Sequence, residues 1–191
     1  MEYKKPFAEI IESSCSKFLA QTWKHQTKPN LGSLVTTQIN EIKIIGLVTN
    51  IQTGSQDPMR YPFTYKKTEE ELKKEQPQIF EFLKTIFEVQ IVGYKNKNKI
   101  YYSLPTNPPN IHSFIKHTEE ELFDKFFENT NFLPLLFNSQ ITNIDEVLIA
   151  MLSNIKNLNK KFLSKFAKTF SLLSGNDYKR LKLFFKRAQI K

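Results

Sequence analysis

The sequence constrains the fold most strongly between residues 42 and 65, which read IKIIGLVTNIQTGSQDPMRYPFTY. The first ten residues are rich in Ile and Val, and such a short β-branched run predicts a strand that is buried on at least one face. The remainder is rich in turn residues, and Pro62 keeps Tyr61 out of the helical region. We therefore expect the chain to leave a sheet here as an extended loop that carries Arg60, Tyr61 and Tyr65 outward.

Several other stretches predict further strands. Residues 7–23 have the pattern of a hairpin or a long bent strand, and residues 34–37 begin a strand that turns back into the one at 42–51. Residues 88–94 and 99–104 flank the polar turn KNKN, which is the clearest hairpin signal in the chain. The run PTNPPNIHSFI at 105–115 contains three prolines, and we expect it to end the β portion.

Two TEEE runs predict the beginnings of helices. In the first, Thr68 and Glu71 form a capping box, and Pro77 interrupts the helix, so we expect two short helices at about 68–75 and 77–86. The second run predicts another capping box at Thr118. Later helices are predicted at 144–154, 160–173 and 176–188, where apolar residues recur at helical spacing.

These elements predict an α+β fold. It consists of a small antiparallel β-barrel with a helical insertion, followed by a C-terminal helical domain. We expect the barrel domain to span residues 1–116, with the insertion at about 66–86, and a basic helical domain to span residues 117–191.

The positive charge is confined to one end of the chain. The formal net charge is +9, yet residues 1–155 hold 17 Lys and Arg against 18 Asp and Glu. Residues 156–191 hold 11 basic residues against a single acid, Asp177. Such asymmetry indicates an acidic partner, either nucleic acid or an acidic protein surface.

The basic side chains of this C-terminal segment cover the polar sides of two predicted helices. A solvated face on a Lys-rich protein is the alternative interpretation, but one acid leaves almost no i, i+4 ion pairs to offset the repulsion. The residues predicted to bind nucleic acid or an acidic partner are Lys161, Lys165, Lys168, Lys179, Arg180, Lys182, Lys186 and Arg187.

The central loop is a second candidate. Arg60 lies beside Tyr61 among turn residues, and Arg and Tyr are enriched at protein interfaces. We predict that Arg60, Tyr61 and Tyr65 contact a protein partner. The alternative is an arginine that stacks on its aromatic neighbours and fixes the loop.

The sequence gives little support for catalysis or cofactors. None of the five glycines belongs to a Walker loop or a GxGxxG motif. His112 and His117 have no further ligands at metal-binding spacing, and Cys15 with His25 as a base is a weaker interpretation than an inert thiol. We predict no enzyme activity, no cofactor and no metal site. The lack of a long apolar run and the single Cys15 predict a cytoplasmic protein without a membrane segment.

The order of the β segments resembles a known family. The segment FAEIIESSCSKFLAQTW at 7–23 is followed by LGSLV at 31–35, IGLV at 45–48 and VGY at 92–94, before the proline-rich exit. This pattern resembles the HAS barrel found at the N-terminus of HerA-type hexameric ATPases and of catalytic subunits of rotary ATP synthases. The resemblance covers about residues 6–115 with the insertion removed.

The resemblance implies a role in assembly, because such barrels are associated with ring formation and with docking of accessory subunits. No ATPase domain follows the barrel in this sequence, so the resemblance does not imply that this chain hydrolyses ATP. We therefore expect a non-enzymatic docking or adaptor module that partners a hexameric ring ATPase in DNA processing. The alternative is a direct nucleic-acid-binding protein that uses the basic C-terminal helices.

Overall fold

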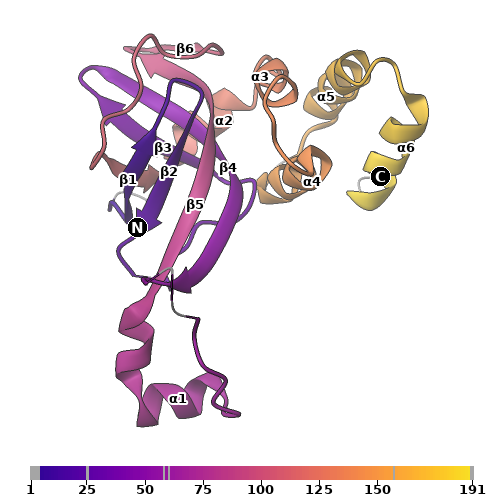
Figure 1. The fold of residues 1–191 in the computed structure, drawn as a ribbon. Coiled ribbons are helices and arrows are strands. Elements are labelled where there is room, and N and C mark those ends of the chain that lie inside the picture. Colours follow the sequence, from indigo (N-terminus) through magenta and orange to yellow (C-terminus); the bar gives the residue numbers. More distant parts are fainter. Residues whose placement is uncertain (1–4, 25, 58, 60, 157, 190–191) are drawn as a thin grey trace.

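A computed structural model describes residues 5–24, 26–57, 59, 61–156 and 158–189 (Figure 1). Six strands form a closed antiparallel barrel in the order β2-β1-β7-β3-β4-β5, because β5 pairs back onto β2. A short seventh strand, β6, extends the sheet beyond β5. The strands are β1 (Ala8–Ser13), β2 (Lys17–Thr22), β3 (Leu34–Ile39), β4 (Ile42–Ser55), β5 (Leu83–Asn96), β6 (Lys99–Tyr101) and β7 (Phe114–His117). Together with the helices, this architecture confirms the predicted α+β fold.

The barrel interior is filled by side chains that alternate with outward-facing neighbours along each strand. Ile44 of β4 and Ile91 of β5 point inward, whereas Ile45 and Val92 belong to a different apolar cluster. Phe7 and Phe87 stack inside the barrel with ring centroids 5.8 Å apart. This interior cluster comprises Phe7, Ala8, Ile10, Phe18, Ala20, Val35, Ile44, Val48, Phe87, Val89, Ile91 and Ile115.

Five C-terminal helices lie beside the barrel and share a core with its outer wall (Figure 1). Leu34, Ile45, Leu47 and Val92 of the barrel are buried in the same apolar cluster as Phe126, Met151, Phe166 and other helical residues. The helices are α2 (Glu120–Phe126), α3 (Leu133–Phe137), α4 (Ile144–Asn154), α5 (Lys160–Leu173) and α6 (Tyr178–Arg187). The proposed division of the chain at residues 116 and 117 stays a prediction.

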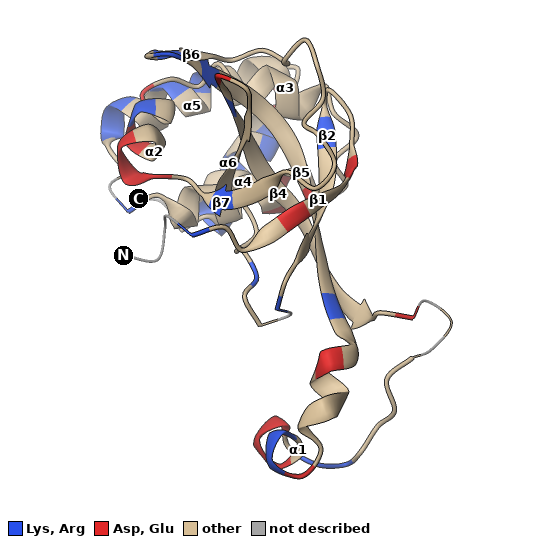
Figure 2. Cartoon of the chain, turned by 90° about the vertical axis from the view of Figure 1, so that its left-hand side faces the viewer, with Lys and Arg blue, Asp and Glu red and all other residues tan. Residues whose placement is uncertain are grey.

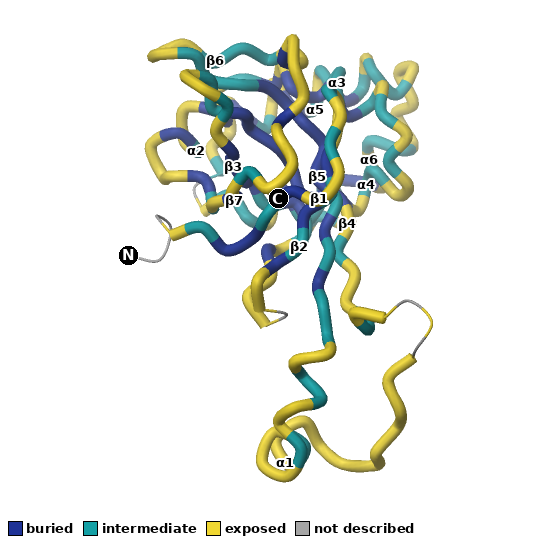
Figure 3. The backbone as a smooth tube through the Cα atoms, turned by 60° about the vertical axis from the view of Figure 1, so that its left-hand side comes forward, coloured by how far each residue is buried: buried dark blue, intermediate teal, exposed yellow. Residues whose placement is uncertain are grey.

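The insertion forms an arm that projects from the barrel as a continuation of β4 and β5 (Figures 1 and 3). The arm, here defined as residues 52–86, includes α1 (Glu69–Glu75) and the 3₁₀ helix η1 (Pro77–Phe82). The predicted capping box is confirmed. The Thr68 hydroxyl accepts a hydrogen bond from the Glu71 backbone N–H, and the Glu71 carboxylate accepts one from the Thr68 backbone N–H. Neither α1 nor η1 buries a residue.

The arm also corrects two predictions. The strand at 42–51 continues to Ser55, and the helix predicted to end at residue 86 ends at Phe82. Residues 83–86 begin β5 instead, since they pair with Gln52 to Ser55 of β4. The Thr53 and Thr85 hydroxyl oxygens lie 2.8 Å apart across this ribbon. Cross-strand pairing therefore outweighs the local helical spacing of apolar residues.

Two further predictions fail at the end of the barrel. The exit segment at 105–115 runs into β7, whose residues pair with both β1 and β3 and so complete the barrel wall. The second capping box is absent, because α2 begins at Glu120 and the Thr118 hydroxyl is buried without a hydrogen-bond partner among the described residues. The Thr118 N–H donates instead to the Leu34 carbonyl, which draws Thr118 towards β3.

Within the described residues, none of the helices combines the length and apolarity needed to cross a membrane.

Candidate functional site

The arm presents large apolar side chains to solvent. Met59 and Tyr61 are each 89% exposed, Phe63 is 82% exposed and Phe82 is 63% exposed. Tyr65 is also exposed, whereas Arg60, predicted to contact a partner, lies outside the described residues. Single exposed apolar residues are normal on a protein surface, so the predicted contact of Tyr61 and Tyr65 with a protein partner stays a prediction.

Local contacts hold the arm in shape without covering these side chains. Lys67 and Glu75 form an ion pair that ties the entry of α1 to its last turn, and Lys73 pairs with Glu69 at 2.5 Å. The Lys73 ammonium also lies 5.8 Å from the centroid of the Phe80 ring in η1. These contacts involve α1, its entry and η1, while Tyr61, Phe63 and Tyr65 stay exposed.

Two of the predicted basic residues form ion pairs within the chain. The Arg180 guanidinium binds Asp145 of α4 through two hydrogen bonds of 2.7 and 3.1 Å, and Arg187 pairs with Glu146. Arg180 also lies over the rings of Phe137 and Phe170, at 5.8 and 5.5 Å. The hydrogen bonding that Arg180 donates to the Asp145 carboxylate raises the pKa of Arg180 above its ordinary value. Both arginines thus fasten α6 to α4, and their binding role stays a prediction.

The predicted lysines are exposed and lie on two helix faces. Lys161, Lys165 and Lys168 recur at i, i+4 and i+7 along α5, where basic positions are seen in Figure 2. The same spacing argument places the α6 lysines on the face opposite the buried Phe184. None of these lysines forms an ion pair with another described residue. The α6 group consists of Lys179, Lys182 and Lys186.

The structure also reveals an aromatic cluster on the outer barrel wall that the sequence analysis missed. The Trp23 indole N–H donates to Glu9 at 2.8 Å, and His112 Nδ1 lies 3.2 Å from the other carboxylate oxygen of Glu9. The Trp23 ring meets the Phe114 ring edge-on, with centroids 5.4 Å apart. The hydrogen bond from Trp23, together with that from His112, lowers the pKa of Glu9. Glu9 and Trp23 are far in sequence from His112 and Phe114, so no local pattern predicts their contact. The only sequence signal was that Trp23 is the single tryptophan of the chain.

The weaker sequence candidates do not come together. His117 stacks on Phe7 at 4.3 Å, whereas His112 contacts Glu9. In the described part of the chain, no three His, Cys, Asp or Glu side chains are grouped so that they could hold a metal ion. Cys15 is a partly buried free thiol, and its suggested base, His25, is outside the described residues.

Comparisons with known proteins identify the barrel. The family model of the HAS barrel domain matches residues 7–96, which extend from the residue before β1 to the end of β5 and include the arm. A search of curated proteins found no match. The match agrees with the resemblance inferred from the LGSLV and IGLV segments, both of which lie inside the matched range. Residues 7–96 of this chain therefore belong to a HAS barrel domain, and β7 adds the sixth strand of the closed barrel.

Proposed function

We propose that this chain is a non-enzymatic docking or adaptor module in which the HAS barrel carries an arm that binds a protein partner. The partner proposed from the family resemblance is a hexameric ring ATPase that acts in DNA processing. We also propose that the module works in the cytoplasm. The chain has no Walker motif, so in this proposal ATP hydrolysis belongs to the partner.

The exposed arm is the observation that supports this proposal. Its helices bury no residue, and Tyr61 and Phe63 are among the most exposed large apolar side chains of the described chain. Burying an aromatic side chain at an interface contributes about 1.5–3 kcal/mol, and a few such residues supply most of the affinity in many protein complexes. A segment that contributes this little to the core of its own chain is suited to bind another protein.

Affinity capture from a nuclease-treated lysate tests the docking role. We expect the chain to retain a ring ATPase, and we expect the double substitution Tyr61→Ser and Phe63→Ser to abolish the capture. A matched control replaces Leu172 and Leu183, which are exposed apolar residues on α5 and α6, by Ser. Equal capture by the arm variant and the unmodified chain would contradict docking through the arm, and a partner captured only from a lysate without nuclease treatment would contradict the adaptor role.

A second candidate is direct binding of nucleic acid by the C-terminal helices. The exposed lysines of α6 favour it, since none of them forms an ion pair with a described residue. If about six phosphates are neutralised, log K should fall with log salt at a slope of roughly −5. Replacing Lys179, Lys182 and Lys186 by Glu should abolish a shift of labelled DNA, while the Tyr61 and Phe63 variant should bind DNA normally.

A further inference from the structure

A cleft between α5 and the segment after α2 has the features of an anion site. It encloses about 340 Å³, which is within the range of small-molecule sites. Phe127 and Phe162 also line it, although both side chains are buried, with ring centroids 5.9 Å apart in an edge-to-face contact. The remaining lining residues are polar or charged and come from the two walls, Glu128 and Asn129 on one side and Asn159, Lys161 and Lys165 on the other.

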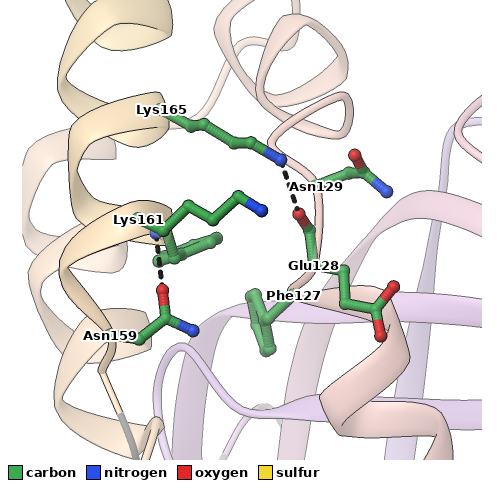
Figure 4. A pocket seen from close by; sticks show the side chains of 7 residues that line it. Phe127, Glu128, Asn129, Asn159, Lys161 and Lys165 are labelled. Atoms are coloured by element: carbon green, nitrogen blue, oxygen red, sulfur yellow. Dashed lines mark hydrogen bonds between the residues drawn. The ribbon is translucent and has the colours of Figure 1, made fainter.

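Two ammonium groups enter this cleft from the same wall. Lys161 and Lys165 are four residues apart on α5, so their side chains lie on one face of the helix. Lys165 donates to the Glu128 backbone carbonyl at 3.3 Å, and Lys161 makes no hydrogen bond or ion pair with a described residue. Figure 4 shows the Glu128 carboxylate turned away from both lysine side chains. Lys161 and Lys165 therefore form no ion pair with Glu128, the acidic residue that lines the cleft.

Neutral contacts hold the two walls in place. The Asn159 side-chain oxygen accepts from the Phe162 N–H at 2.7 Å, which leaves its NH₂ group facing the cleft in Figure 4. Beyond the lysines, the hydroxyl oxygens of Thr130 and Thr169 lie 3.0 Å apart and join the segment after α2 to α5. The Thr130–Thr169 contact thus joins the two walls before any ligand binds, which reduces the entropy lost on binding.

We propose that this cleft binds the phosphate monoester of a nucleotide. A phosphate monoester carries about −1.5 to −2 charge at pH 7 and three strong acceptor oxygens, which matches two ammonium groups and one amide donor. The cleft is larger than a phosphate group alone, so it has room for the attached nucleoside. The monoester belongs either to a free nucleotide or to the 5′ end of a nucleic-acid strand. This site lies on α5, so it does not depend on the function proposed for the arm.

Calorimetric titration of the full chain with AMP and with adenosine tests the phosphate preference. Charge-assisted hydrogen bonds contribute about 1.5–3 kcal/mol each, so AMP should bind at least about tenfold more tightly than adenosine. In parallel, 5′-phosphorylated and 5′-hydroxyl oligonucleotides of one sequence test the strand end. Selective binding of the phosphorylated strand without AMP binding assigns the site to strand ends, while binding of AMP assigns it to free nucleotide. Equal affinity for both oligonucleotides together with no preference for AMP overturns the proposal.

A pair of double variants tests the location of the site. Replacing Lys161 and Lys165 by Gln should weaken the selective ligand at least about tenfold, by the same energetic argument. Replacing the exposed Lys24 and Lys28 by Gln removes the same charge from the segment between β2 and β3 and, because salt screens distant exposed charges, should change affinity by less than about twofold. Circular dichroism checks that both variants remain folded. An equal loss of affinity in the two variants would show that the ligand is held by general electrostatic attraction, and it would overturn the proposed site.

Discussion

At the scale of single residues, Gly32 shows how closely the helices approach the barrel. Its backbone has a φ of +70°, and a Cβ placed there would lie 2.3 Å from the Met151 backbone nitrogen and 2.7 Å from the Ala150 carbonyl carbon. Next to it, the Leu31 carbonyl accepts from the Asn154 side chain at 2.8 Å. The LGSLV segment is therefore shaped by contact with the backbone of α4, where only glycine fits.

Substitution of Gly32 by Ala should be strongly destabilising. A left-handed backbone costs an alanine about 1–2 kcal/mol, and forcing a Cβ against fixed backbone costs about 1–3 kcal/mol more. Gly175→Ala is a matched control, because Gly175 also has a φ of +70°, yet a Cβ added there would meet no atom of the other described residues within 4 Å. Urea unfolding should show a clearly larger loss for Gly32→Ala than for Gly175→Ala. Equal losses would show that backbone conformation, and not the contact with α4, determines the effect.

At the scale of elements, the sequence predicted correctly those helices and strands that are determined by neighbouring residues, such as a helix cap or a tight turn. The Thr68 capping box lies within four residues, and the KNKN turn lies between its own two strands. The predictions failed where a distant partner decides the outcome. Residues 83–86 pair with β4 across the arm. β7 consists of only four residues, and the two strands that it pairs with, β1 and β3, come much earlier in the chain. The same holds for the site residues. The ion pair of Arg180 was not predicted, because its partner, Asp145, is 35 positions away in the sequence.

Removing residues 56–82 of the arm should leave the rest of the fold intact. The variant joins Ser55 directly to Leu83 through Asn-Gly, a sequence that favours a tight hairpin turn between paired residues. Because α1 and η1 bury no residue, little packing is lost, and a shorter connection costs less entropy to close. We expect the thermal midpoint to stay the same or to rise while capture of the protein partner is lost. Unfolding of this variant would show that the arm is required for stability.

At the scale of the whole molecule, part of the barrel wall is buried on both faces. Val35, Ile44 and Ile91 fill the barrel, while their neighbours Leu34, Ile45 and Val92 pack against the helices. This double burial explains the continuous apolar runs of the sequence, since a strand with one solvated face would alternate apolar and polar residues. The sequence analysis expected burial on at least one face. The second face could not be inferred, because the helices that cover it come later in the chain.

The barrel and the C-terminal helices should therefore unfold together. Trp23 is the only tryptophan and lies on the barrel, so its fluorescence follows the barrel, whereas circular dichroism at 222 nm follows mainly the helices. We expect the two signals to change at the same urea concentration, as in a two-state transition. Earlier loss of the helical signal would contradict a shared core and would favour two independent domains divided near residue 116.

A fragment of residues 1–117 tests the same point from the barrel side. Without the helices, Leu34, Ile45, Leu47 and Val92 become exposed, and each loses about 1.5–3 kcal/mol of burial. Because a typical domain is stable by only about 5–15 kcal/mol, the fragment should unfold or aggregate. Replacing these four residues by Thr, which suits strands and tolerates water, should restore a soluble barrel if the exposed wall is the cause. A fragment that folds without these substitutions would show that the barrel is stable without the helices.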